Sequence, residues 1–337
     1  MKKLIYLFLS ALLLSCASQK NIVEAVPAKY VKSITPEELK KHLVVIASDE
    51  MEGRGTGSEG QKKAGRYLIN QYKSDKINYP KNAVDYYQQV PAAFMKTARI
   101  SSLPDSENIW AFIEGTEYPE EIVVVTAHYD HLGVIDGKIH NGADDDGSGT
   151  VALLEIAQAF QQAKNEGKGP KRSVLILHVT AEEHGLLGSK FYSEHPLFPL
   201  GNTVANINID MIGRRDTAHP DSNNYIYLIG SDYLSSELHQ ICEQMNEQYT
   251  QLEIDYKYNE RNDPNRFYYR SDHYNFAKHG IPSVFLFSGV HADYHAAGDD
   301  VEKIEFDALT KRAQLAFAIV WEVANRKTRL VVDKSGK

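Results

Sequence analysis

The chain has 337 residues, 42% of them hydrophobic and 24% charged, which is typical of a globular protein with a large core. This length fits one large α/β domain or two smaller ones. The formal net charge of −8 leaves nucleic-acid binding without an electrostatic footprint, so we expect no nucleic-acid partner.

The first 16 residues have the pattern of a secretory signal. Two lysines precede an apolar run over residues 4–14, which is too short to span a bilayer. The run ends in LLSC, which resembles the lipobox of bacterial lipoproteins. The resemblance implies a signal peptide over residues 1–15, lipidation of Cys16 and an envelope protein that faces the periplasm or the exterior. An ordinary cleaved signal with a chance cysteine is the alternative.

Residues 16–33 are predicted to be a polar tether. The only other cysteine, Cys242, has apolar neighbours at helical spacing and is expected to be a buried thiol. Thr35-Pro36-Glu37-Glu38 is a capping box that starts a helix. A Gly-rich loop follows over residues 48–60, before a helix over 61–72. It lacks the Gly-Lys-Ser/Thr ending of a P-loop, so we expect a surface loop or a loop at the rim of an active site.

From residue 108 onward, strand and helix patterns alternate. Strands are predicted at 108–114, 121–126, 172–179, 203–209, 224–229, 252–258 and 283–288. Helices are predicted at 148–163, 186–194, 232–249, 271–279 and 307–325. The runs IVVVTA, SVLILHVTA and SVFLFS are continuously apolar, as in strands covered on both faces. The pattern predicts a three-layer α/β/α fold with a mostly parallel sheet, and a single domain after residue 33.

The densest chemistry lies in residues 126–149, TAHYDHLGVIDGKIHNGADDDGSG, between a buried strand and a helix. Ligands bind just past the carboxyl ends of such strands. His128 and Asp130 suit a metal ligand with an orienting carboxylate, although for this pair taken alone an ordinary loop histidine is the better explanation. Three adjacent aspartates, residues 144–146, repel one another, and a cation would remove that repulsion. A calcium loop is the alternative, but the EF-hand spacing is absent.

Three later segments place an acid or a histidine at a similar position. Glu182 and Glu183 follow a buried strand, and neighbouring residues there point in different directions. One can therefore bind metal while the other acts as a general base. Asp210 ends an apolar strand, and His295 supplies a late imidazole. Ser271-Asp272-His273 is a poor catalytic triad because its members are consecutive, and no G-x-S-x-G elbow occurs.

Taken as an ordered set, six segments carry a family resemblance: HYDHLG, GADDDGSG, AEEHGLLGS, NIDMIG, SDHYNF and YHAAGDD. They resemble the di-zinc aminopeptidases of the bacterial leucyl-aminopeptidase and aminopeptidase Y type. Glutamate carboxypeptidase, the transferrin receptor and, more distantly, glutaminyl cyclase are related to these. The resemblance covers residues 35–325 and implies a mixed, mostly parallel eight-stranded sheet between helices. We expect one zinc peptidase domain over residues 34–330, without a protease-associated insert.

The resemblance fills all five metal-ligand positions: His128, Asp145, Glu183, Asp210 and His295. It implies two Zn²⁺ ions per chain, with Asp145 bridging them. His128 and Asp210 would hold one ion, and Glu183 and His295 the other. A complete ligand set argues against a binding protein of the transferrin-receptor type.

The same resemblance assigns the remaining roles. Glu182 would be the general base, Asp130 would orient His128, and Tyr294 would stabilise the oxyanion. The bond between Asp145 and Asp146 is expected to be cis.

The sequence therefore predicts a membrane-anchored lipoprotein that removes N-terminal residues from peptides with a water activated by two zinc ions. A non-catalytic peptide- or partner-binding lipoprotein on the same fold is the alternative, as are a single-zinc glutaminyl cyclase and a dipeptidase or carboxypeptidase. Arg270 fits a contact to a substrate carboxylate and an exposed salt bridge equally well. The expected partners are peptide substrates and, through Cys16, a membrane. A monomer is compatible with the sequence.

Overall fold

The computed structural model describes residues 28–97 and 102–335, and its strands form one large sheet and one small hairpin. The predicted signal peptide, Cys16 and the tether up to residue 27 lie outside the described residues. The large sheet consists of β1 (Tyr87–Val90), β2 (Ser106–Ile113), β3 (Tyr118–His128), β6 (Arg172–Val179), β7 (Thr203–Ile209), β8 (Tyr225–Ile229), β9 (Glu253–Asp255) and β10 (Ser283–Phe287). Their order across the sheet is β1-β2-β6-β3-β7-β10-β8-β9.

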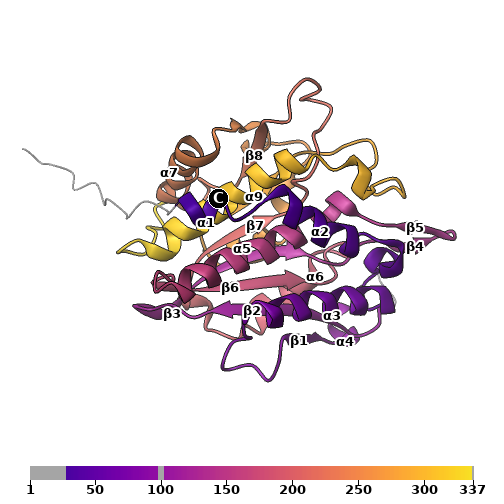
Figure 1. The fold of residues 1–337 in the computed structure, drawn as a ribbon, viewed down its shortest axis with the longest axis horizontal. Coiled ribbons are helices and arrows are strands. Elements are labelled where there is room, and N and C mark those ends of the chain that lie inside the picture. Colours follow the sequence, from indigo (N-terminus) through magenta and orange to yellow (C-terminus); the bar gives the residue numbers. More distant parts are fainter. Residues whose placement is uncertain (1–27, 98–101, 336–337) are drawn as a thin grey trace, which may run out of the picture.

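The middle of the sheet is parallel. Strand β3 pairs in parallel with β6 and β7, and β7 pairs in parallel with β10. The outer strands β1, β2 and β8 join antiparallel, which makes the sheet mixed. Every residue of β6, β7 and β10 is buried, as expected of parallel strands covered on both faces. The predicted α/β/α fold with an eight-stranded, mostly parallel sheet is confirmed (Figure 1).

Helices cover both faces of this sheet. They are α1 (Ala28–Val31), α2 (Pro36–Ile46), α3 (Glu59–Ser74), α4 (Ala92–Met95), α5 (Gly149–Asn165), α6 (Leu187–Glu194), α7 (Ser236–Met245), α8 (His273–Ala277) and α9 (Phe306–Asn325). On one face, α2, α3, α5, α7 and α9 form a large core with strand residues such as Val123 and Val125. On the other face, Val124 packs in a smaller core with Tyr192 of α6 and Phe276 of α8. Successive strand residues thus enter opposite cores.

Capping residues explain where helices α2 and α3 begin. Thr35 accepts a hydrogen bond from the backbone N–H of Glu38 at 3.3 Å, and Pro36 occupies the first turn, as predicted. Ser58 accepts from the N–H of Gln61 at 3.2 Å, so α3 begins two residues earlier than predicted. Cys242 is buried in α7, as predicted, and burial raises the pKa of its thiol.

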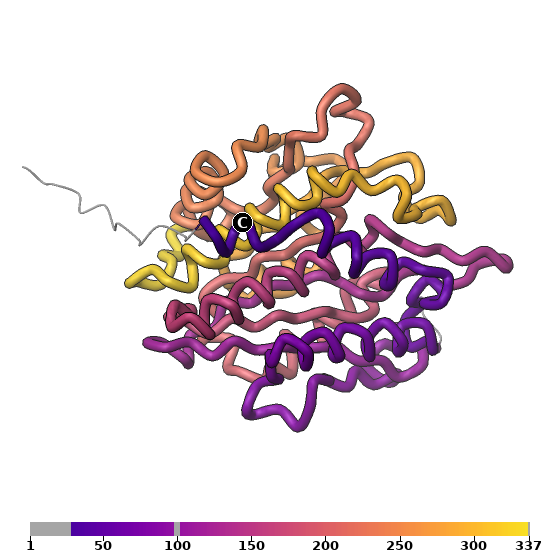
Figure 2. The backbone as a smooth tube through the Cα atoms, viewed as in Figure 1, coloured from indigo at the N-terminus to yellow at the C-terminus, as the bar shows by residue number. Residues whose placement is uncertain are grey.

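The tether predicted to reach residue 33 was too long. Residues 28–31 form α1, which contacts α5 and α9, and the Tyr30 side chain is fully buried. The Tyr30 ring stacks on Trp321 with 5.5 Å between centroids, and its hydroxyl donates to Glu166 at 2.8 Å. The N-terminal end of the described chain therefore lies against the C-terminal helix (Figure 2). Tyr30, an aromatic residue within a polar stretch, anchors residues 28–31 through these contacts.

Three short strands were not predicted. Strand β1 has the sequence YQQV, which lacks an apolar run, and pairs with β2 at one edge of the sheet. β4 (Gly133–Ile135) and β5 (Lys138–His140) form a separate hairpin that projects from the body of the molecule (Figure 1). Within the described ranges, no helix combines the length and apolar character needed to span a bilayer.

Candidate metal centre

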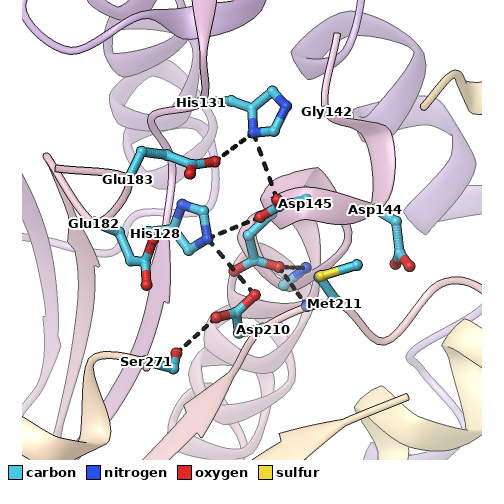
Figure 3. Close-up of polar contacts among 12 residues, drawn as sticks. His128, His131, Gly142, Asp144, Asp145, Glu182, Glu183, Asp210, Met211 and Ser271 are labelled. Atoms are coloured by element: carbon cyan, nitrogen blue, oxygen red, sulfur yellow. Dashed lines mark hydrogen bonds and ion pairs between the residues drawn. The ribbon is translucent and has the colours of Figure 1, made fainter. Parts of the chain in front are cut away.

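The carboxyl ends of the parallel strands bring the predicted site residues to one edge of the sheet. His128 is the last residue of β3, Asp210 follows β7 directly, and Glu182 and Glu183 follow β6 after a short turn. In Figure 3 these side chains and Asp145 point toward a common centre. This edge is where open α/β sheets bind their ligands.

All five predicted metal ligands converge there. His128 Nε2 lies 3.2 Å from Asp145 Oδ1 and 3.6 Å from Asp210 Oδ1. His295 Nε2 lies 3.3 Å from Asp145 Oδ2 and 3.1 Å from Glu183 Oε2. Each oxygen of Asp145 thus faces a different histidine, and its Oδ2 is buried without a hydrogen-bond donor among the described residues. The donors form two adjoining groups that share Asp145.

The backbone is unusual around these groups. The predicted cis bond between Asp145 and Asp146 is present. Ala181, Met211 and His295 have positive φ angles of 54°, 54° and 55°, which L-residues rarely adopt. Such conformations tend to gather at functional sites, where the surrounding structure holds them in place.

The three adjacent aspartates, residues 144–146, make different contacts. Asp144 Oδ1 accepts from the backbone N–H of Gly213 at 2.6 Å, and Asp146 Oδ1 accepts from Met211 at 3.1 Å and Gly149 at 2.9 Å. Backbone donors thus satisfy one oxygen of each flanking carboxylate, and Asp145 is the member directed at His128 and His295. Asp299 completes the support, because its Oδ2 accepts from the N–H groups of Asp144 and Asp145 at 2.9 and 3.1 Å.

Asp130 lies beside His128, but its carboxylate is not the nearest group to the imidazole. His128 Nδ1 is 3.0 Å from the main-chain carbonyl of Asp130 and 3.8 Å from its carboxylate. That carboxylate accepts instead from the Thr56 hydroxyl at 2.8 Å and from the N–H of Glu182 at 3.2 Å. Donation from Nδ1 to the carbonyl would leave the Nε2 lone pair facing the centre.

The loop predicted to lie at the surface or rim forms a buried support. The Arg54 side chain is fully buried, and its guanidinium donates to the carbonyls of Ile46, Tyr129, Asn141 and Gly142. Burial lowers the pKa of Arg54, and the charges of nearby carboxylates, that of Asp146 foremost, act in the opposite direction. Arg54 therefore ties three loops together and places a positive charge beneath an acidic centre.

His131 is a site residue that the sequence analysis missed. It is fully buried, and its Nδ1 lies 2.7 Å from Glu183 Oε1 and 3.8 Å from Asp145 Oδ2 (Figure 3). His131, Asp145 and Glu183 form one set of side chains close enough to hold a metal ion, and His128, Asp146 and Asp210 form another. The signal was present in HYDH, where a second imidazole follows the first by three residues.

The two neighbouring glutamates have different surroundings. Burial raises the pKa of Glu182 well above its usual value, and the charge of His128 offsets this only in part. Burial would also raise the pKa of Glu183, but hydrogen bonds from His131 and His295 outweigh it and hold this pKa below its usual value. Glu183 is therefore built into the histidine cluster, whereas Glu182 faces the cavity.

The centre opens into a pocket with about 350 Å³ of space between atoms, part of it open to solvent, here called the central pocket. Its polar wall contains Asp145, Glu182, Asp210, Arg270, Tyr294 and His295. Its apolar wall contains Met211, Phe267, Phe285, Phe287 and Val290. The Tyr294 ring stacks on His295 with 3.9 Å between centroids, and its hydroxyl accepts from Arg270 Nη2 at 3.4 Å.

The Ser271-Asp272-His273 segment does not form a triad. The Ser271 hydroxyl donates to Asp210 Oδ2 at 2.6 Å and accepts from Asn208 at 2.8 Å. The His273 ring stacks on Phe285. Ser271 thus positions a carboxylate of the centre, in agreement with the rejection of a serine hydrolase.

Comparison with known proteins identifies the family. The model of "Peptidase family M28" matches residues 108–320, which is more than half of the sequence. The chain belongs to peptidase family M28.

Among curated relatives, leucine aminopeptidase 1 of Sclerotinia sclerotiorum is 30% identical over 61% of this chain and 53% of its own length. Leucine aminopeptidase 1 of Metarhizium robertsii is 25% identical over 74% of this chain and 60% of its own. The chain thus spans just over half the length of these relatives.

Solved structures agree on the fold. The LapA aminopeptidase of Legionella pneumophila superposes with a TM-score of 0.68 at 21% identity, covering 97% of this chain and 81% of its own. BSAP, a zinc aminopeptidase from Bacillus subtilis, gives a TM-score of 0.67 at 16% identity, covering 89% and 98%. At these identities the likeness concerns the fold, and function has to be argued from the site.

Proposed function

We propose that the chain is a zinc-dependent aminopeptidase that hydrolyses the N-terminal residue from peptides. The observation that carries the proposal is the convergence of two imidazoles and three carboxylates, with Glu182 free beside them. Family membership and the names of the relatives support the reaction class.

The donor set fits a pair of zinc ions. Buried carboxylates without counter-ions repel one another strongly, and Asp145 Oδ2 lacks a hydrogen-bond donor in the described part of the chain. His128 with Asp210 would hold one ion, and Glu183 with His295 the other, with one oxygen of Asp145 toward each. Two bound zinc ions would polarise the scissile carbonyl and lower the pKa of the attacking water.

The remaining roles belong to the chain's own side chains. Glu182 would take a proton from the attacking water and deliver it to the leaving amine. Its buried position and raised pKa suit a carboxylate that must hold the proton between these two steps. The Tyr294 hydroxyl, next to His295, would donate to the oxygen on which negative charge develops. The carbonyl of Asp130 would fix the His128 ring.

The central pocket favours an apolar N-terminal residue. Its apolar wall of one methionine, three phenylalanines and one valine excludes water from a bound side chain. The Glu182 carboxylate opposite, which the proposal leaves free of metal, would attract the free amino group of a peptide, and an N-acyl group would remove that attraction. Both features favour an aminopeptidase with a preference for aliphatic or aromatic residues.

Turnover of leucyl peptides, matched N-acetyl-leucyl peptides and N-terminal glutaminyl peptides, with zinc measured on the same sample, tests this proposal. We expect hydrolysis of the free leucyl peptides only and two zinc ions per chain. One zinc ion with cyclisation of the glutaminyl peptide would identify a glutaminyl cyclase. Cleavage of the blocked peptides at their C-terminus would identify a carboxypeptidase. Bound zinc without turnover would identify a binding protein.

His131 gives a prediction about metal affinity. We expect His131→Ala to weaken binding of one zinc ion by about 10–100-fold, because the imidazole contacts Glu183 and orients it. The other ion should be retained, since His128 and Asp210 do not contact His131. Competition titration with a zinc chelator measures both affinities. His195→Ala, which removes an exposed histidine, is the matched control. Unchanged zinc affinity in His131→Ala would remove His131 from the centre.

We also propose that the protein is a lipoprotein of the cell envelope, on the strength of the apolar signal and LLSC. Replacing Cys16 by serine is expected to move the protein from the membrane fraction to the soluble fraction, because a lipid anchor needs the thiol. Immunoblotting of the two fractions measures this. If the variant stays with the membranes, Cys16 is not the anchor.

A further inference from the structure

A second hollow adjoins the central pocket and differs from it in charge. It holds about 890 Å³ of space open to solvent and is here called the outer hollow. Four side chains line both spaces: Phe267, Arg270, Val290 and Tyr294. The outer hollow therefore lies beside the space above the carboxylate cluster and shares a wall with it. Its own lining residues include Lys257, Tyr258, Asn265 and Asp216.

Two cations face the outer hollow without an anionic partner. The exposed Arg270 guanidinium contacts the Tyr294 hydroxyl at 3.4 Å and lies 4.9 Å from the centre of the Phe267 ring. Lys257 Nζ lies 5.3 Å from the centre of the Tyr258 ring. Among the described residues, neither cation has a carboxylate within ion-pair distance. Aromatic contacts hold both side chains at the wall and leave their N–H groups available.

Asp216, the carboxylate that lines the outer hollow, does not neutralise the charges of Arg270 and Lys257. Asp216 is buried and accepts from the Tyr227 hydroxyl at 2.7 Å, from His219 Nδ1 at 2.9 Å and from the backbone N–H groups of Ala218 and His219. Its oxygens are thus already occupied. The neighbouring arginines are paired, Arg214 with Asp293 at 2.9 Å and Arg215 with Glu305 at 3.2 Å. Arg270 has no such ion pair among the described residues.

We infer that Arg270, supported by Lys257, binds a carboxylate of the substrate. The inference rests on the proposed function and adds the substrate class: short peptides with a negative charge close to the scissile bond. Arg270 contacts Tyr294, which stacks on His295, so the guanidinium lies one side chain away from the metal centre. Consecutive Cα atoms are about 3.8 Å apart, which keeps the free carboxylate of a dipeptide close to its peptide bond.

The chemistry of the guanidinium suits this role. Its planar fork can bind both oxygens of a carboxylate at once, which a lysine cannot do. Glu182, which the proposed function leaves free of metal, would attract the amino end of a peptide, while the outer hollow attracts an acidic group. A zwitterionic dipeptide matches both charges. A peptide with aspartate or glutamate after the first residue presents the same chemistry through its side chain.

Four substrates separate these sources of the carboxylate: Leu-Gly, Leu-Gly amide, Leu-Glu amide and Leu-Gln amide. In the native protein we expect kcat/KM for Leu-Gly to exceed that for Leu-Gly amide at least about tenfold, the effect expected of one charge-assisted hydrogen bond. A similar ratio of Leu-Glu amide to Leu-Gln amide would show that a side-chain carboxylate is also bound. The ratios cancel any general loss of activity.

In Arg270→Gln, each ratio of kcat/KM that is high in the native protein should fall close to one. Arg270→Lys should keep only part of the native ratio, because lysine retains the charge but lacks the planar fork of the guanidinium. Lys257→Gln should lower the ratio by a smaller factor. The matched control is Arg266→Gln, which removes an exposed arginine of the same loop that lines neither space.

Two outcomes would overturn the inference: ratios near one in the native protein, or ratios that survive in Arg270→Gln. Either result with good turnover of all four substrates leaves the proposed aminopeptidase intact. If the native, zinc-loaded protein hydrolyses none of the four, the proposed function itself fails.

Discussion

Replacing Glu182 by glutamine is expected to lower kcat by at least about 10²-fold and to leave two zinc ions bound. The substitution keeps the size of the side chain and removes the group proposed to accept the proton of the attacking water. Glu182 faces the central pocket, and its backbone is what holds it: its N–H donates to the Asp130 carboxylate at 3.2 Å, and its carbonyl accepts from the N–H groups of Gly185 and Leu186 at 2.8 and 2.9 Å. No contact that builds the metal centre is lost.

Glu183→Gln is the matched comparison, one residue further along. Its carboxylate lies 2.7 Å from His131 and 3.1 Å from His295, so its charge is part of the centre. We expect this variant to lose zinc first and activity as a consequence, with activity partly restored by added zinc. Zinc content and kcat of the two variants decide the assignment. An active Glu182→Gln together with full zinc occupancy in Glu183→Gln would contradict it.

Replacing Arg54 by methionine is expected to lower the free energy of unfolding by about 3–5 kcal/mol, the cost of breaking a buried, charged network. Four carbonyl groups, those of Ile46, Tyr129, Asn141 and Gly142, would lose the hydrogen bond from Arg54. The carboxylates above would also lose a counter-charge. This is a large share of the stability of a typical domain.

Urea denaturation of the metal-free protein measures this change without a contribution from bound zinc. Arg66→Met is the matched control, because Arg66 lies on α3 with about half of its side chain exposed and forms a surface ion pair with Glu59. Surface pairs contribute about 1 kcal/mol or less. Equal midpoints for the two variants would show that Arg54 does not hold the loops together.

The sequence predicts those parts of this fold that depend on continuous apolar runs. β6 was predicted with its observed bounds, 172–179, because it contains the apolar run VLIL and the acidic residues Glu182 and Glu183 follow shortly after it. The same logic placed His128 and Glu182 at strand ends. β1 was not predicted, because two of its four residues are glutamines. Its pairing with β2 determines its strand conformation more than its own residues do.

The candidate site was predictable as a list of residues, and less so as a network. Of the five predicted ligands, His128, Glu183 and Asp210 lie at or just after strand ends, whereas Asp145 and His295 lie in connecting segments and were assigned through the family resemblance. The work of Arg54, Asp299 and Ser271 depends on contacts with loops far away in the chain, such as the bond from Ser271 to Asp210. Nothing local marks such residues. The backbone carbonyl that faces His128 is equally invisible, since every residue has one.

The two borders of the large sheet are short: β1 has four residues and β9 has three. A strand at a border exposes unpaired N–H and C=O groups, and a long one is a template on which another chain can add a strand. Four or three residues offer few such groups. Neighbouring copies that meet edge to edge therefore find little backbone with which to extend the sheet. The short border strands thus limit the extension of the sheet by a second molecule.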